Sequence, residues 1–220
     1  MSVEVLVPEH TVGLKAGTAK RYRGKRQVRS ILDEARSILI GEGYAGLTLR
    51  KVSKNLDISL GNLTYYFPSK IELLKAIIVD LLTEYERALA AEQKNFPDDV
   101  HGRFKAWICY LVADCKKADT RSVFFQIWGL ATHSDIVSEL RDDMYRAARD
   151  EHLAMISALN PNASEDDINA LVGLVITMIE GFHVVADLGD GALQLPADYD
   201  DRLCETIYQI VLGACQPSSR

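Results

Sequence analysis

The chain has 220 residues, of which 48% are hydrophobic and 25% are charged, and its formal net charge is −6. This composition is ordinary for a globular protein that buries a real core. The N-terminus has no basic segment and few apolar residues before Pro8, so we expect no secretory signal, and the longest uncharged apolar run, residues 168–179, is too short to span a bilayer. The four cysteines form no CxxC pair, which is typical of reduced thiols in a cytoplasmic protein.

Charge is unevenly distributed between the two ends of the chain. Residues 15–70 contain 12 Lys and Arg against 4 Asp and Glu, a formal charge of +8, whereas the remaining 13 basic and 27 acidic residues carry −14. A basic N-terminal quarter on an acidic body indicates that one end meets a polyanion, although a merely solvated basic face has the same composition. Residues 1–22 lack periodicity, and we expect them to form a flexible arm whose later part is basic.

Apolar residues recur with the helical period along most of the chain, and no strand-like alternation of useful length is present. A stripe over residues 28–39 predicts a first helix that ends at Gly41 and Gly43. Ser69 and Glu72 form a capping box before a long helix that reaches about residue 93. Shorter helices are predicted over 49–56 and 59–67, and further ones over 100–116, 121–131, 136–159, 165–188 and 199–214. The predicted fold is therefore all-α, with about nine helices.

In the stretch DISLGNLTYYFPSK, residues 57–70, few side chains suit a buried core and many suit an exposed surface. Ser59 suits the N-cap of a short helix, and Leu63 and Phe67, four residues apart, point the same way into a core. Thr48 is a suitable N-cap for the basic helix before it. Two short helices joined by a three-residue turn predict a helix-turn-helix.

The face opposite that core suits DNA recognition. In a helix-turn-helix the second helix enters the major groove while the first crosses the backbone. Asn62 can bond an adenine edge bidentately, and Thr64 offers a hydroxyl or a methyl group. The other displayed residues allow close approach of the backbone or reach phosphates and thymine methyl groups, and they are Gly61, Tyr65, Tyr66, Arg50 and Lys70.

The segment GYAGLTLRKVSKNLDISLGNLTYYFPSKIELLKAI resembles the DNA-binding domain of TetR-type transcriptional regulators, and the match covers residues 27–77. The resemblance implies a helix-turn-helix domain over residues 23–70 and a helical ligand-binding and dimerisation domain over 71–220. It implies DNA contacts by Thr48, Arg50, Gly61, Asn62, Thr64, Tyr65, Tyr66 and Lys70. Asp57 stands where the family's turn usually has Gly, but Asp tolerates the left-handed conformation. Thr64 stands where Tyr is common.

Aromatic residues mark apolar helix faces in the second half of the chain, and plain core is the favoured interpretation for most of them individually. The resemblance nevertheless implies a cavity for a small apolar ligand among these helices. Its candidate lining residues are Trp107, Tyr110, Phe125, Trp128, Met178, Phe182 and His183. Polar groups such as His133, Glu180 and His183 could orient the ligand.

Two further motifs are weak. GEGYAG, residues 41–46, matches the dinucleotide-binding pattern GxGxxG, which needs a preceding strand. The residues before GEGYAG have the helical period instead, so we interpret the motif as a helix end and a turn. Glu180 and His183 form a single E-x-x-H, with Asp187 one turn on, and a core or pocket histidine is favoured over a metal ligand, although a metal is not excluded. We predict no catalytic residue, metal site or cofactor.

The sequence therefore predicts a ligand-responsive, DNA-binding transcriptional regulator that is cytoplasmic and not an enzyme. We expect a homodimeric repressor, released from a palindromic operator by a small molecule of unknown identity. Dimerisation is expected through the last two helices, because residues 165–188 are apolar on nearly all sides. The apolar side chains that indicate this interface are Ile168, Leu171, Val172, Val175, Ile179 and Phe182, with Leu203, Ile207, Ile210 and Val211 on the final helix. The alternative is a helical enzyme or metal-binding bundle that carries a basic helical hairpin.

Overall fold

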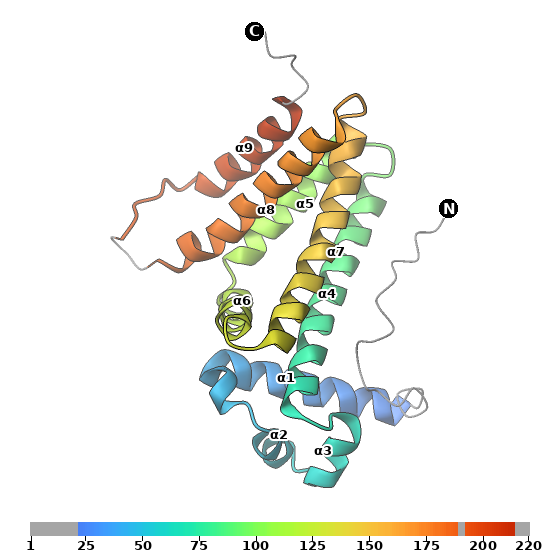
Figure 1. Cartoon of the computed structure of the whole chain (residues 1–220), viewed down its shortest axis with the longest axis vertical. Coiled ribbons are helices and arrows are strands. Elements are labelled where there is room, and N and C mark those ends of the chain that lie inside the picture. Colours follow the sequence, from blue (N-terminus) through green and yellow to red (C-terminus); the bar gives the residue numbers. More distant parts are fainter. Residues whose placement is uncertain (1–21, 189–191, 214–220) are drawn as a thin grey trace.

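The structure is a computed structural model that describes residues 22–188 and 192–213. Across these residues the chain forms nine helices and no strand, which confirms the all-α prediction (Figure 1). The helices are α1 (Tyr22–Gly46), α2 (Leu49–Asn55), α3 (Leu60–Tyr66), α4 (Lys70–Asn95), α5 (Val100–Cys115), α6 (Ala118–Ala131), α7 (Asp135–Leu159), α8 (Glu165–Asp187) and α9 (Tyr199–Gly213). Apart from its last residue, the predicted arm over residues 1–22 lies outside the described residues.

Side-chain caps begin the helices where the sequence predicts them. The hydroxyl oxygens of Thr48, Ser59 and Ser69 each accept from the backbone N–H three residues on, at 3.1, 3.1 and 3.2 Å. Each bond satisfies an N–H that the first helical turn leaves unpaired, which stabilises the helix by about 1 kcal/mol. One predicted start is wrong. α6 begins at Ala118, with Thr120 buried inside it, and its N-cap residue Lys117 makes no side-chain cap that the sequence could signal.

α1 continues to Gly46, but its helical conformation breaks at Gly43, where the sequence predicts an end. This residue has φ 69° and ψ 179°, a conformation that only glycine adopts without strain. The side chain of Gln126 from α6 packs against the break, where a Cβ atom on Gly43 would lie 3.3 Å from its Nε2. GEGYAG therefore bends a helix, and the helical segment before it is not the strand that a dinucleotide loop requires.

The first helices form a head on a longer helical body. α1 crosses the lower end of the body, α2 and α3 lie below it, and α4 rises from them beside α7 (Figure 1). Two ion pairs hold α1 on α4, with nitrogen–oxygen distances of 2.8 Å for Arg29–Asp80 and 2.9 Å for Arg36–Glu84. The head is therefore attached to the body by packing and by charge.

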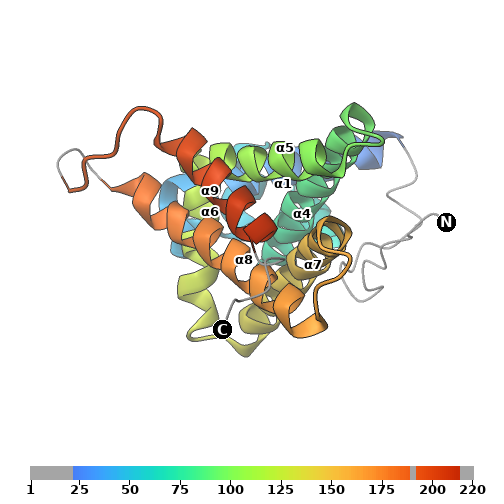
Figure 2. The same cartoon turned by 90° about the horizontal axis from the view of Figure 1, so that it is seen from above.

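Two hydrophobic cores support these parts. The first core is formed by α1, α2, α3, α4, α6 and the first half of α7. It contains Leu63 and Phe67, which are 0% and 1% exposed, as predicted. The second joins α5, the end of α7, α8 and α9, which lie together when the molecule is seen from above (Figure 2). The head's core thus extends into α6 and α7, so the head does not have a core of its own.

The apolar run over residues 168–179 lies within α8, a longer helix that the sequence predicts over residues 165–188. α8 has 23 residues and a mean hydropathy of 1.8 over its most apolar window, which suffices for a membrane span by length and composition alone. The run of residues 168–179 is by itself shorter than such a span needs, as expected, whereas the helix that contains it is not. A buried helix of a globular protein has the same pattern, and α8 packs its Ile168, Val175 and Phe182 against α5 and α7 within this chain.

Substitutions at Gly41 and Gly43 of α1 should have opposite effects on stability. Gly43→Ala should lower the free energy of unfolding by about 1–3 kcal/mol, because alanine is strained at φ 69°. Gly41→Ala is the matched control, since Gly41 is helical and open space surrounds it, and it should raise stability by about 1 kcal/mol. Urea unfolding followed by circular dichroism measures both changes. Equal midpoints for the two variants would show that the break is not a constraint.

Candidate nucleic-acid interface and buried ring cluster

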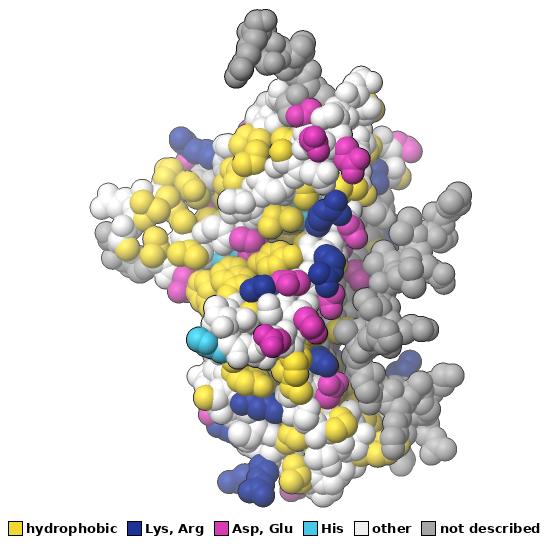
Figure 3. Space-filling view, in the orientation of Figure 1, with side chains coloured by type: hydrophobic (Ala, Val, Ile, Leu, Met, Phe, Trp, Pro, Cys, Tyr) yellow, Lys and Arg dark blue, Asp and Glu magenta, His cyan; other side chains and the backbone are white. Residues whose placement is uncertain are grey.

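The exposed face of α2 and α3 carries most of the predicted DNA contacts. Thr48, Arg50, Gly61, Asn62 and Tyr65 are exposed. Thr64, Tyr66 and Lys70 are half-buried. Figure 3 shows Lys and Arg side chains gathered at this lower end of the molecule, over α2. The structure therefore brings the eight predicted residues to one end of the molecule.

The turn between α2 and α3 positions Asn62. Asp57 has φ 52°, the left-handed conformation that the turn requires in place of glycine. The Ser59 cap fixes the first turn of α3 by accepting from the backbone N–H of Asn62, and Asn62 is exposed while the next residue, Leu63, is buried. Below it, the Tyr65 and Tyr66 rings meet edge to face at 5.2 Å. Asn62 is therefore presented on a short helix whose conformation is fixed at both ends.

The cations near this face are not equivalent. Lys70 places Nζ 3.7 Å from the centre of the Tyr44 ring, and partial burial lowers its pKa. Lys51 is paired with Glu42 of α1. Arg50, Lys25 and Arg26 are exposed. Lys70 therefore also has a structural contact, whereas these three cations are exposed to solvent and suit contacts with phosphates.

In the body, aromatic side chains from three helices form a ring cluster, which we define as Phe124, Phe125, Trp128, Tyr145 and His183. The ring centres of Phe124 and His183 are 4.6 Å apart, and those of Trp128 and His183 are 5.7 Å apart. Trp128 Nε1 donates to Tyr145 Oη at 2.8 Å. Three of the seven predicted ligand-pocket residues, Phe125, Trp128 and His183, meet here.

The other four predicted pocket residues lie elsewhere. Trp107 and Tyr110 stack on each other at 5.5 Å and meet Tyr85 of α4. Phe182 packs on Tyr199 at the start of α9, and Met178 lies at the edge of the second core. His133, which could orient a ligand, is exposed just after the end of α6 and does not reach the ring cluster. The ring contacts therefore divide the predicted pocket residues among separate groups.

Polar groups adjoin the ring cluster. His183 Nδ1 lies 3.6 Å from Glu180 Oε2 and 3.4 Å from Cys115 Sγ, while the buried His183 Nε2 has no hydrogen-bond partner within the described part of the chain. Burial lowers the pKa of His183 and raises the pKa of Glu180 to about 7, the latter opposed by hydrogen bonding from Tyr145. Asp187, the third member of the weak metal motif, turns instead to Arg121, at 3.0 Å.

α6 joins this ring cluster to α1. Phe124 and Trp128 face the cluster, and two polar side chains of the same helix bind the C-terminal part of α1. Tyr44 N–H donates to Gln126 Oε1 at 2.9 Å, and Ser122 Oγ donates to the Ile40 carbonyl at 3.3 Å. A shift of α6 would therefore act on the helix that carries the head.

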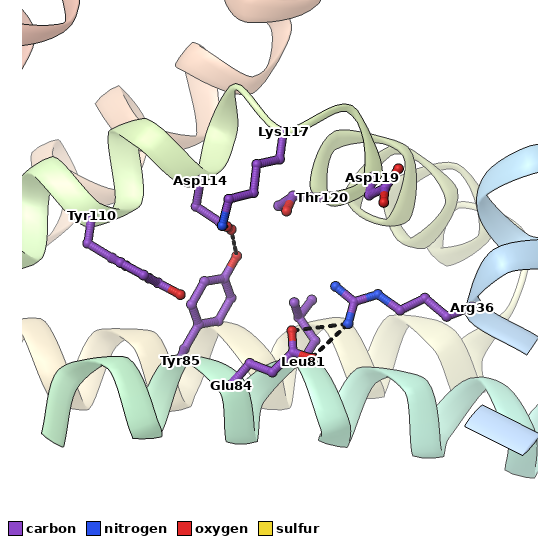
Figure 4. Close-up of a pocket in the computed structure, with 9 residues that line it drawn as sticks. All are labelled: Arg36, Leu81, Glu84, Tyr85, Tyr110, Asp114, Lys117, Asp119 and Thr120. Carbon is purple, nitrogen blue, oxygen red and sulfur yellow. Dashed lines mark hydrogen bonds and ion pairs between the residues drawn. The ribbon is translucent and has the colours of Figure 1, made fainter. Parts of the chain in front are cut away.

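A polar pocket of about 160 Å³ lies where α1, α4, α5 and α6 meet (Figure 4). Four of its charged groups are paired with one another. Tyr85 Oη donates to Asp114 at 2.7 Å, Lys117 Nζ pairs with the same carboxylate at 2.8 Å, and Arg36 points to Glu84. We interpret the pocket as a structural joint between head and body, because these pairs connect α1, α4, α5 and the start of α6.

Sequence reasoning missed two residues of this arrangement. Tyr145 follows Met144 in a charged segment, and a single aromatic next to the buried stripe of α7 was an available signal. Gln126 gives no signal, because a glutamine in a helix is ordinary and its partner on α1 is distant in sequence.

Known proteins with similar sequences were found in two comparisons. The sequence profile of the family described as "Bacterial regulatory proteins, tetR family" matches residues 31–77. An HTH-type transcriptional regulator in the dhlA 5′ region of Xanthobacter autotrophicus is 30% identical over 188 residues, which cover 83% of this chain and 87% of that protein. The HTH-type transcriptional repressor KstR of Mycolicibacterium smegmatis is 28% identical over 193 residues, covering 74% and 89%.

The fold is also similar to those of solved structures. A transcriptional regulator from Saccharomonospora viridis in complex with choline superposes with a TM-score of 0.62 at 18% identity. The superposition covers 85% of this chain and 96% of that one. At this identity the likeness concerns the fold alone.

The exposed Asn62 generates a prediction about sequence reading. Asn62→Ala should weaken binding to the best duplex by about 1–3 kcal/mol and relax the preference at one base pair per half-site, because a bidentate contact to a base edge is lost. Asn95→Ala, at the far end of α4, is the matched control and should change neither quantity. Fluorescence anisotropy on the best and a scrambled duplex measures both. Equal weakening on both duplexes would mean that Asn62 does not read a base.

Proposed function

The chain belongs to the TetR family of bacterial transcriptional regulators, and from this membership we propose that it is a repressor which a small molecule releases from its operator. It is a DNA-binding regulator, and the family match favours this function over the alternative of a helical enzyme or metal-binding bundle. KstR, one of the relatives, is a repressor, and the regulator from Saccharomonospora viridis was solved with choline, which supports a small-molecule effector. We infer that the protein works in the cytoplasm, where its operator is.

One observation carries this proposal, namely the capped α3 that displays Asn62 at the basic end of the molecule. We assign residues 1–22 to a basic arm, 23–70 to the DNA-reading domain and 71–220 to effector binding and dimerisation. Arg50 and the exposed Lys25 and Arg26 would contact phosphates, which adds affinity for any sequence. The effector would bind in the body, so effector binding and operator binding would be coupled through the helices that lie between the two sites.

We infer a homodimer, on different residues from those that the sequence indicated. The apolar side chains named for α8 and α9, such as Val175, Ile207 and Val211, are covered within one chain and need no partner. Other large apolar side chains of α8 and the segment after it are 38–52% exposed, and they are Leu174, Val184, Leu188, Leu193 and Leu195. An exposed apolar patch of this kind is typical of an interface between protein chains.

Release of the operator then follows a two-state scheme. A dimer presents two copies of α3, which must fit successive major grooves about 34–36 Å apart or a multiple of that distance. An effector that binds more tightly to a second arrangement of body and head increases the fraction of dimers in that arrangement, in which the two α3 helices no longer have the spacing of successive major grooves. The link runs through α6, because this helix contacts both the ring cluster and α1.

Selection from a random duplex library tests this function. The protein should enrich a near-palindrome whose half-sites lie one helical turn, or a multiple of it, apart. Val184→Glu should yield a monomer by light scattering and weaken binding to that operator by on the order of 100-fold or more, because the second half-site no longer adds avidity.

Ile136→Glu is the matched control for the dimer. Ile136 is 48% exposed at the start of α7, outside the patch on α8, so this variant should stay dimeric and bind normally. Failure to enrich any sequence would contradict the proposed function. A monomeric wild-type protein that still selects a palindrome would contradict only the dimer.

A further inference from the structure

The carboxyl group of Glu180 lies in an unusual position beside the ring cluster. Its side chain is 24% exposed, and its Oε2 atom is buried without a hydrogen-bond partner among residues 22–188 and 192–213. His183 lies 3.6 Å away on one side, and Tyr145 contacts the carboxyl group on the other. Both neighbours touch Trp128, so the carboxyl group stands next to the aromatic rings.

Glu180 has no cationic partner in the part of the chain that the structure describes. Two arginines act on the neighbours of Glu180, and both have other partners. Arg121, which affects the pKa of His183, is directed to Asp187 and to the carbonyl groups that end α5. Arg141, which affects the pKa of Tyr145, pairs with Asp142. A carboxylate held close to aromatic rings without a counter-ion is costly to bury, since desolvation disfavours its charge. An unpaired acid in such surroundings is typical of a site that gains its counter-ion from a ligand.

The other titratable groups around Glu180 cannot supply the charge. Burial raises the pKa values of Cys115 on α5 and Tyr145 on α7 and lowers that of His183 on α8, so all three stay neutral near pH 7. α6 contributes Phe124, Phe125 and Trp128, which carry no charge. Glu180, with a pKa of about 7, is therefore the group of this set that ionises near neutral pH.

Aromatic faces complement a carboxylate in binding an organic cation. Tryptophan attracts alkylated ammonium groups most strongly, and the attraction increases when the site excludes water. Trp128 and Phe125 are half-buried with ring centres 5.6 Å apart, and the ring centre of Phe124 lies 5.8 Å from that of Trp128. The unpartnered His183 Nε2 adds a hydrogen-bonding position for a hydroxyl group on the same ligand.

We propose that the ring cluster and Glu180 form a binding site for a small organic ammonium cation, with the Glu180 carboxylate as its counter-ion. This inference rests on the proposed function, because it names the chemical class of the effector. The rings touch one another in this structure, so the cation enters by moving the half-buried Trp128 and Phe125 apart. Because both belong to α6, entry of the cation moves the helix that also holds α1 through Gln126.

Calorimetric titration of the full chain without DNA tests the site. The probes are choline, a hydroxyl-bearing quaternary ammonium ion, and 3,3-dimethylbutan-1-ol, in which carbon replaces the charged nitrogen. Choline should bind on the order of tenfold or more tightly than the neutral alcohol, because only choline gains the carboxylate and the cation–π attraction. Its affinity should also fall by about tenfold per pH unit below pH 7, since a proton then competes for Glu180, and level off above it.

Glu180→Gln should remove the preference for choline at pH 8 and leave the affinity for the alcohol within about twofold, since shape is kept and charge is lost. Retained binding of the alcohol also shows that this variant is folded. Glu151→Gln is the matched control, because Glu151 is a second carboxyl group of the body whose pKa burial raises to about 7, on α7 facing Glu86. This variant should bind both probes as the wild-type protein does.

Four results would overturn the inference: no binding of choline, equal affinities for the two probes, an unchanged preference in Glu180→Gln, or an equal loss in Glu151→Gln. None of them bears on operator recognition, which the library selection tests separately. If choline binds as expected but leaves operator affinity unchanged, the cation site stands and the proposed release of the operator fails.

Discussion

The junction between α6 and α1 is the constraint on which the rest of the molecule depends. α1 must break where α6 passes, and only glycine at residue 43 permits a break with φ 69°. Gln126 fills the space beside the break and accepts from the Tyr44 N–H, an amide that the interrupted helix would otherwise leave unpaired. Because packed interiors rearrange between discrete states, a side chain that satisfies a backbone break transmits motion better than a loose contact.

Much of the head could be predicted from the sequence because its signals are local. Thr48, Ser59 and Ser69 act on backbone atoms three residues away, so caps and helix starts follow from the pattern alone. The burial of Leu63 and Phe67 likewise follows from their spacing on one short helix. Asp57 tolerates the left-handed conformation of the turn because the short polar side chain of aspartate can form hydrogen bonds with the nearby backbone.

The body was less predictable because its arrangement depends on contacts between distant residues. An aromatic stripe identifies core faces but not which faces meet, so seven candidate pocket residues divide among separate groups of rings, and Tyr145 was overlooked. The extent to which one chain covers α8 and α9 depends on how α5 packs against both helices. This packing cannot be predicted from the number of apolar residues in a single helix. The start of α6 carries no cap, and its position follows from the burial of Thr120.

Coupling between Trp128 and Gln126 in operator binding tests most directly whether α6 connects the ring cluster to the head. Operator affinity is measured by anisotropy for Trp128→Ala, Gln126→Ala and the double variant. If α6 is the link, disturbing the cluster changes operator affinity only while Gln126 holds Tyr44, so the two changes should be non-additive by about 0.5–2 kcal/mol. Free energies that add within about 0.3 kcal/mol would show that the cluster and the head do not communicate through this helix.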